Sequence, residues 1–191
     1  MPADPAYLWS DALRRAIRRN RRDAHNRYLQ LATIRADGAP ALRTLVFRGL
    51  SDDGGELYMV TDQRSAKAGE VAARPASEAC WYFSHTREQF RLRGELRLDA
   101  ADADDPALRL SLWEGLSEAA RAQFYGPHPG RPLGAEAPAM DAGGDDPPPP
   151  FAALTLAIVA VDHLVLRGEP QRRWLSRLDE AGCWTSEAVN P

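Results

Sequence analysis

With 191 residues, the chain has room for one domain with a full hydrophobic core but not for two ordinary domains. Its hydrophobic fraction of 44% and charged fraction of 27% are typical of globular proteins, and no apolar run approaches the roughly 20 residues of a membrane span. The net charge of −3 argues against a general nucleic-acid binder, and no apolar stretch follows the first charges as in a secretory signal. We therefore expect a cytoplasmic protein.

An amphipathic helix opens the chain. Apolar residues recur at helical spacing from Asp4 to about His25, and arginines occupy the other face, so we expect an N-terminal helix within residues 1–26. Its basic run, RRAIRRNRR, could contact nucleic-acid phosphates. Such runs are usually solvated faces, and the acidic balance of the chain disfavours this alternative, so we expect no nucleic-acid partner.

The hydrophobic period then changes to that of strands. Residues 27–50 contain two strands joined by a turn at ADG, and GGELYMVT gives a third strand after the SDDGG turn. A short helix is predicted over Ala66–Ala73, with Ser65 at its N-cap and Pro75 beyond its end. Two more strands, EACWYFSH and EQFRLRGELRL, follow, and the second alternates between apolar and polar side chains.

The second half of the chain mixes helices, a loop and strands. Residues 106–125 predict one or two helices, and residues 126–150 predict a flexible loop because they are rich in Pro and Gly. Three closing strands are expected in FAALTLAIVAVDHLVLRG, RRWLSRLD and CWTSEAVN. Six to eight strands with few helices indicate a mainly β (α+β) single domain over residues 1–191, either a small barrel or a sandwich.

Lys67 is the one lysine among 24 Lys and Arg residues. It falls in the first turn of a predicted helix, where the positive end of the helix dipole repels a cation. We expect the backbone N–H groups from about Arg64 to Lys67 to be unpaired and to face the same space as the Ser65 hydroxyl, which makes an anion site. A bound phosphate would make the lysine favourable there. The alternative is an exposed lysine left by drift toward arginine codons.

A second cation strengthens the phosphate interpretation. The motif RTLVFRG places Arg43 and Arg48 at the two ends of an apolar strand, in the hairpin before the Lys67 segment. Because facing residues of adjacent antiparallel strands lie within reach of each other, Arg43 and Lys67 could share one phosphate. The alternative is that Arg43 is merely solvated.

Other chemistry-bearing residues form no pattern. The two cysteines, Cys80 and Cys183, belong to no CxxC or Cys/His cluster, so we expect small buried apolar side chains and no metal site. None of the four histidines has a Ser or Cys at a spacing typical of a hydrolytic triad.

The motifs RTLVFRG, TDQRSAK and REQFRLRGEL, in this order, resemble the FMN-binding split barrel of the pyridoxamine 5′-phosphate oxidase superfamily. The segment RRWLSRLDEAGCWTSEAVNP resembles the C-terminal segment of that family. The resemblance extends over about residues 29–95 and 154–191. It implies a six- to eight-stranded antiparallel split barrel with flanking helices, FMN as cofactor, and a homodimer whose flavin sites lie between subunits.

The resemblance also implies a set of FMN contacts. The family's phosphate ligands match Arg43, Ser65 and Lys67, and its arginine late in the chain matches Arg173. Gln89 and Arg173 would reach a flavin whose phosphate the partner subunit holds. The complete cofactor set implied is Arg43, Thr44, Leu45, Val46, Arg48, Thr61, Ser65, Lys67, Gln89 and Arg173.

The chain departs from the family where the vitamin substrate binds. Counting back from Arg173, the family's substrate-holding Arg and His are Glu169 and Gln171, and Arg48 replaces a lysine that binds the substrate phosphate. The helical residues that grip this phosphate have no secure counterparts among Trp113, Ser117 and Arg121. The resemblance therefore implies an FMN-dependent oxidoreductase acting on an unknown small substrate. The alternatives are a flavin carrier or sensor without a substrate, and a genuine pyridoxamine 5′-phosphate oxidase.

Overall fold

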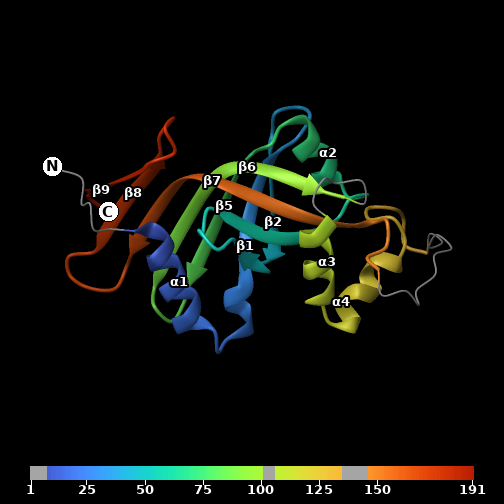
Figure 1. Cartoon of the computed structure of the whole chain (residues 1–191), viewed down its shortest axis with the longest axis horizontal. Coiled ribbons are helices and arrows are strands. Elements are labelled where there is room, and N and C mark those ends of the chain that lie inside the picture. The colour runs from blue at the N-terminus through green and yellow to red at the C-terminus, as the bar shows by residue number, and fades with distance from the viewer. Residues whose placement is uncertain (1–7, 101–105, 135–145) are drawn as a thin grey trace.

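The computed structural model describes residues 8–100, 106–134 and 146–191. The helices are α1 (Trp9–Asn20), α2 (Ala66–Ala73), α3 (Pro106–Glu114) and α4 (Glu118–Ala122), with 3₁₀ turns η1 (Ala24–Arg27) and η2 (Gln123–Tyr125). The strands are β1 (Tyr28–Ile34), β2 (Pro40–Val46), β3 (Gly49–Leu50), β4 (Glu56–Asp62), β5 (Ala76–Phe83), β6 (Glu88–Asp99), β7 (Phe151–Val165), β8 (Arg172–Leu178) and β9 (Trp184–Val189). Figure 1 shows α1 against the sheet and α2, α3 and α4 gathered at one end.

All strand pairs are antiparallel, and the sheet does not close on itself. The order is β2-β1-β5-β6-β7-β4-β3, and β8 pairs with both β7 and β9. This confirms the expected split barrel with flanking helices. The described residues form nine strands, one above the expected range, because the two-residue β3 precedes β4 as a separate short pairing.

The long strand β7 divides the sheet. Residues 151–157 pair with β4, whereas residues 160–165 pair with β8, and β6 runs along both halves. The register between β6 and β7 shifts at Gly94, where an added Cβ would lie 1.8 Å from the Ala157 carbonyl oxygen. Only glycine fits this bulge, and the bulge lets β7 leave one neighbour and join another.

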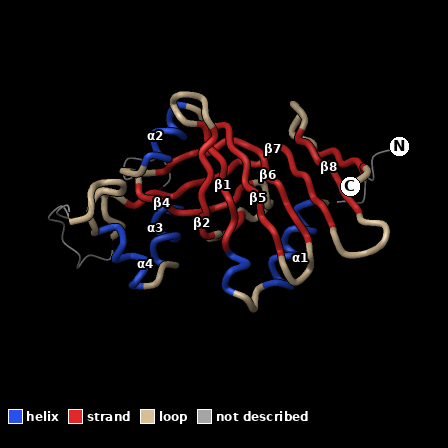
Figure 2. The backbone as a smooth tube through the Cα atoms, turned by 180° about the vertical axis from the view of Figure 1, so that it is seen from behind, coloured by secondary structure: helices blue, strands red, loops and turns tan. Residues whose placement is uncertain are grey.

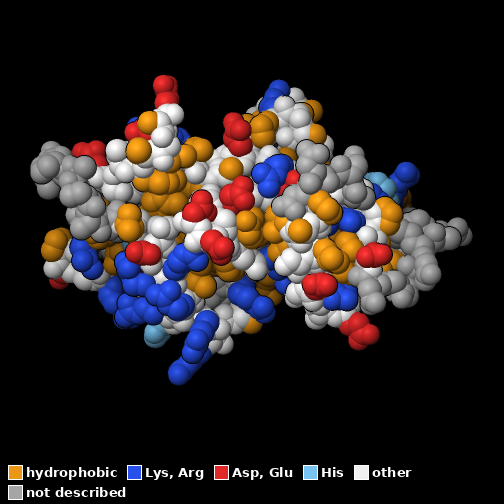
Figure 3. Space-filling view, in the orientation of Figure 1, with side chains coloured by type: hydrophobic (Ala, Val, Ile, Leu, Met, Phe, Trp, Pro, Cys, Tyr) orange, Lys and Arg blue, Asp and Glu red, His pale blue; other side chains and the backbone are white. Residues whose placement is uncertain are grey.

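The core lies on the sheet face that α1 covers. The alternation expected in β6 is confirmed, since Phe90 and Leu92 are fully buried and Leu96 is nearly so. Helix α1 adds its apolar stripe of Trp9, Ala12, Leu13 and Ala16, while arginines cover its other side and form the basic cluster seen in Figure 3.

Helix α1 ends earlier than the sequence predicts. It stops at Asn20, whose buried side chain accepts the N–H groups of His85 and Thr86 and donates to the Ala16 carbonyl oxygen. These bonds draw the chain away from the helix toward η1. The predicted start, near Asp4, falls outside the described residues.

The opposite sheet face is open, and Figure 2 shows β1, β5 and β6 with no described helix across them. This open face carries alternate residues of each strand, and Tyr28, Leu42 and Tyr82 are 47%, 69% and 44% exposed on it. Large exposed apolar side chains on one face are typical of an interaction surface.

Three other expectations from the sequence have different outcomes in the structure. Cys80 is half-buried, but Cys183 is exposed, so its expected burial is wrong; Cys183 lies in the β8–β9 turn, where its N–H bonds Asp179. Residues 135–145 of the predicted flexible loop lie outside the described residues. No helix in the described ranges is long and apolar enough to cross a membrane.

Candidate functional site

A pocket of about 350 Å³ opens between the β2 and β4 strands, α2 and the helical region after α3. Six of the ten residues expected at the site line it: Thr44, Leu45, Val46, Arg48, Thr61 and Lys67. The opposite wall, which the sequence did not identify, consists of Leu116, Ala120, Gln123, Phe124 and Pro129. The fold therefore brings the two basic motifs onto one cavity and adds a largely apolar side to it.

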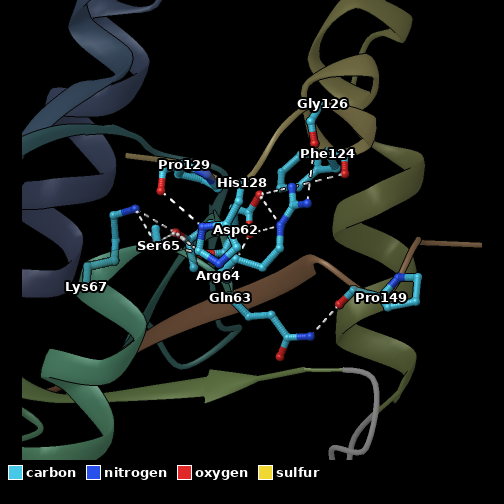
Figure 4. A network of polar contacts seen from close by, with 11 residues as sticks. Asp62, Gln63, Arg64, Ser65, Lys67, Phe124, Gly126, His128, Pro129 and Pro149 are labelled. Atoms are coloured by element: carbon cyan, nitrogen blue, oxygen red, sulfur yellow. Dashed lines mark hydrogen bonds and ion pairs between the residues drawn. The ribbon is translucent and has the colours of Figure 1, made fainter. Parts of the chain in front are cut away.

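Lys67 points back toward the end of β4. Its Nζ donates to the hydroxyl oxygens of Thr61 and Ser65, each at 2.9 Å, as Figure 4 shows for Ser65. Burial, followed by the charge of Arg43, lowers the pKa of Lys67. Lys67 forms no ion pair with any described residue. A partly buried ammonium beside another cation would be stabilised by an anionic ligand.

The turn before α2 partly differs from the expected anion site. Asp62 closes it, accepting the Arg64 N–H at its Oδ1 (2.8 Å) and the Ser65 N–H at its carbonyl oxygen (3.0 Å). The expectation that these two N–H groups are unpaired is therefore wrong. The N–H groups of the first helical residues, Ala66 and Lys67, have no acceptor within the described ranges, and they remain for an anion.

Ser65 occupies the predicted N-cap position without capping the helix. Its hydroxyl donates to the Asp62 carbonyl oxygen at 2.6 Å and accepts from Lys67, and no side-chain cap bond forms. The hydroxyl therefore serves the Lys67 ammonium instead of the helix end, which keeps it at the edge of the pocket.

Arg43 has partners of its own. Its Nη2 donates to Glu70 Oε2 at 2.8 Å, and its Nη1 donates to the Thr33 hydroxyl. The pKa of Glu70 is lowered, first by the Thr33 hydrogen bond and then by Arg43. Arg43 does not line the pocket, although its charge acts on Lys67. A phosphate shared by Arg43 and Lys67 thus stays a prediction, and Glu70 is a competitor that the sequence did not indicate.

Arg48 is the second pocket cation. Its Nε is buried and has no hydrogen-bond partner among the described residues, and burial, with the charge of Arg27, lowers its pKa. A buried guanidinium nitrogen without an acceptor is costly. Together with Lys67 and the two free N–H groups, this orphaned donor fits a ligand that carries a phosphate and further polar oxygens, as FMN does.

Arg64 ties the anion turn to the helical wall (Figure 4). Its guanidinium forms a bidentate pair with Asp62, with Nε–Oδ1 and Nη2–Oδ2 distances of 3.0 and 2.6 Å. It also donates to the carbonyl oxygens of Phe124 and Gly126, at 3.5 and 3.3 Å. The one sequence signal for this contact was the spacing of Asp62 and Arg64 just before Ser65.

The helical wall uses its own polar residues for structure. Ser117 accepts the Ala120 N–H as the N-cap of α4, and Arg121 donates to the Trp113 and Glu114 carbonyl oxygens. The Arg121 guanidinium also lies 5.2 Å from the centre of the buried Trp113 ring. None of Trp113, Ser117 and Arg121 lines the pocket.

Gln89 and Arg173 lie elsewhere in the chain. Both are on the open sheet face, in one row with Leu164, which pairs with Gln89 on β6 and with Arg173 on β8. Arg173 donates to both carboxylate oxygens of Asp162. Within one chain, neither Gln89 nor Arg173 joins the Lys67 pocket.

An antiparallel split barrel with a basic pocket at the start of a short helix defines a binder of a phosphate-bearing cofactor. Comparison with known proteins makes this specific. The family model described as pyridoxamine 5′-phosphate oxidase, FMN-binding domain, matches residues 6–99. A relative from Arabidopsis thaliana, pyridoxine/pyridoxamine 5′-phosphate oxidase 2, is 38% identical, and the alignment covers 96% of each chain.

The chain therefore belongs to the pyridoxamine 5′-phosphate oxidase family and carries its FMN-binding domain. A solved pyridoxamine 5′-phosphate oxidase-related, FMN-binding protein from Nostoc punctiforme is 47% identical, with a TM-score of 0.88, over 98% of this chain and 99% of that one. The match to the oxidase of Pseudomonas paraeruginosa, at 30% identity, covers 54% of this chain and 47% of that enzyme. The family and cofactor inferred from the motifs are thus confirmed.

Proposed function

We propose that this protein is an FMN-dependent oxidoreductase that acts on a small substrate, as a cytoplasmic homodimer formed by a single domain over residues 1–191. The observation that carries the proposal is the pair of pocket cations, Lys67 and Arg48, which have no anionic partner among the described residues. Bound FMN supplies hydride and electron transfer, for which the protein provides position and electrostatics.

The pocket residues divide into three roles. Lys67, with the Thr61 and Ser65 hydroxyls and the N–H groups at the start of α2, would hold the phosphate. The strand residues Thr44–Val46 would lie along the cofactor. Arg48 and Gln123, which line the same pocket from opposite sides, are polar groups that a substrate or the flavin edge can meet. Two converging polar groups favour an enzyme over a passive flavin carrier.

The open sheet face supports the homodimer. Tyr28, Leu42 and Tyr82 expose apolar surface there, and Gln89 and Arg173 lie on the same face. Pairing two such faces would cover the apolar side chains and bring Gln89 and Arg173 of one protomer toward the pocket of its partner.

A second candidate is a genuine pyridoxine/pyridoxamine 5′-phosphate oxidase, which the name of the Arabidopsis relative favours. Against it, the positions for the substrate-holding Arg and His carry Glu169 and Gln171, both exposed at the β7–β8 turn. Among the described residues, the helical wall lines the pocket with no cation, and Arg121 beside it donates to carbonyl oxygens of α3. We therefore propose a different, less anionic substrate.

The test begins with the absorbance spectrum of the purified protein, in which an oxidised flavin is visible directly. Apoprotein would then be titrated with FMN and with riboflavin, which lacks the phosphate. We expect FMN to bind more tightly by at least about one decade, the least that one charge-assisted phosphate contact contributes. Equal affinities would show that Lys67 and its neighbours do not hold a phosphate.

A further inference from the structure

A chain of ion pairs crosses the open sheet face. It runs from Glu78 on β5 through Arg91 on β6 and Asp162 on β7 to Arg173 on β8, one residue from each of four adjacent strands. Arg91 Nε lies 2.5 Å from Glu78 Oε1, and Arg91 Nη1 lies 3.5 Å from Asp162 Oδ2. The signs alternate, so the chain carries no net charge of its own.

The contact between Asp162 and Arg173 is the bidentate member of this chain. Arg173 Nε donates to Asp162 Oδ1 at 2.9 Å, and Arg173 Nη2 donates to Asp162 Oδ2 at 2.7 Å. A fork of this kind fixes the plane of the guanidinium as well as its distance. It leaves Nη1 without an acceptor within the described ranges, so one edge of the guanidinium is available to a ligand.

The strand register places the residues expected at the flavin and the carboxylate of Asp162 in two neighbouring rows. Gln89, Leu164 and Arg173 form one row across β6, β7 and β8, and both polar members are expected at the flavin of the partner. Asp162 stands in the next row, as the partner of Arg91 on one side and Leu175 on the other. The carboxylate of Asp162 therefore lies in the row next to the one that would contact the flavin.

The geometry points to Asp162 as a positioning residue for the cofactor: it holds Arg173 in the orientation in which Arg173 reaches FMN bound in the pocket of the partner protomer. This inference rests on the proposed function. Without the carboxylate, the guanidinium would sample several rotamers, and ordering it on binding would weaken the affinity. Arg91 and Glu78 keep Asp162 itself in place.

The test is FMN affinity, measured by titrating full-length apoprotein and following flavin fluorescence. Asp162→Asn is expected to weaken binding about three- to tenfold, a part of what a charge-assisted contact contributes. In an Arg173→Ala background the same substitution should have no further effect. Asp162→Glu, which keeps the carboxylate, should restore most of the loss. Glu187→Gln is the matched control. It removes the same charge from an exposed residue of β9 that lies in the same row as Asp162 and Leu175.

The outcomes separate this inference from the proposed function. A merely structural Asp162 would lower the melting temperature of the apoprotein and leave FMN affinity intact, and this result would overturn the inference. Independent losses in Asp162→Asn and Arg173→Ala would overturn it as well, as would an Arg173→Ala variant that binds FMN like the unaltered protein. In each of these cases the unaltered protein still binds FMN, so the proposed function stands. Unaltered protein that binds no FMN would overturn both.

Discussion

The Lys67 ammonium lies 2.9 Å from the hydroxyl oxygen of Thr61, which precedes the last residue of β4 and lies six residues earlier in the chain. The strand and the following helix thus fold back on each other around one cation, with the Ser65 hydroxyl as its second partner. Because hydroxyls are neutral, they orient the ammonium without neutralising it, and its charge stays available to a phosphate.

Removing Lys67 should weaken FMN binding and leave the fold intact. Lys67→Ala deletes one charge-assisted contact, worth very roughly 1.5 to 3 kcal/mol, or one to two decades in affinity. Riboflavin affinity should change far less, because riboflavin has no phosphate for Lys67 to hold. The measurement is a titration of both flavins into the variant, with circular dichroism as the control for folding. A parallel loss for both flavins would place Lys67 away from the phosphate.

Arg43→Ala should also weaken FMN binding, and its effect should depend on Lys67. If the two cations share one phosphate, the double variant loses less than the sum of the two single losses, and a double-mutant cycle gives a coupling energy. Glu70→Gln is an informative companion, because it frees the Arg43 guanidinium from its ion pair and should tighten FMN binding. Additive losses would mean that the two cations do not share one phosphate. No loss of FMN affinity in Arg43→Ala would mean that Arg43 serves Glu70 and Thr33 alone.

FMN affinity should fall in the alkaline range. Burial and Arg43 lower the pKa of Lys67 from its ordinary 10.5, so the apoprotein loses this proton at a lower pH than a free lysine does. Since the phosphate binds the charged form, affinity decreases as pH rises toward 10.5. The stability of the apoprotein should change in the opposite direction. Between the lowered pKa of Lys67 and its ordinary value the unfolded chain binds more protons, so the free energy of unfolding rises with pH there.

The check on this pH dependence is the Lys67→Met variant. It should bind FMN weakly with an affinity that changes little between neutral pH and pH of about 10, below the ordinary lysine value. An equally steep decrease in this variant would assign the titration to another group.

The protein should be a dimer whose flavin site needs both protomers. Sedimentation should report twice the mass of one chain, and a charge placed on the open sheet face, as in Tyr82→Asp, should produce monomers with weakened FMN binding. The exposed control is Arg22→Asp, two residues after the end of α1, the helix that packs on the opposite face of the sheet. A monomer that binds FMN as tightly as the unaltered protein would contradict the shared site.

Pyridoxamine 5′-phosphate should be oxidised poorly or not at all by the flavin-loaded protein. The carboxylate of Glu169 would repel a phosphorylated substrate, and losing a cationic grip as well could cost several kcal/mol of transition-state binding, or several decades in rate. Formation of pyridoxal 5′-phosphate under oxygen is the assay, and a Glu169→Arg, Gln171→His double variant should gain activity. Turnover by the unaltered protein at about one per second or faster would show that other residues hold the substrate.

The sequence alone determined the elements and the family. The helix over Ala66–Ala73 was predicted with its observed bounds, because alanines, a serine before them and Pro75 after them are local signals that need no tertiary contact. The alternation in β6 likewise follows from its own side chains. The end of α1 was missed because it depends on hydrogen bonds between the Asn20 side chain and the N–H groups of residues 85 and 86, which are distant in the chain.

Only the tertiary structure decided the partners of each charged group. The roles of Arg43 and Lys67 as phosphate ligands stay predictions from the sequence. The pairing of Glu70 with Arg43 and of Asp162 with Arg173 depends on strand register and helix packing. The Asp62 contact with the Arg64 N–H is local, but it was not predicted from the sequence. The apolar wall of Leu116, Ala120 and Phe124 was also not predicted, because these residues are distant in the sequence from β2 and β4. Backbone propensity is local and can be read along the chain, whereas the pairing of charges over long sequence separations exists only once the sheet has formed.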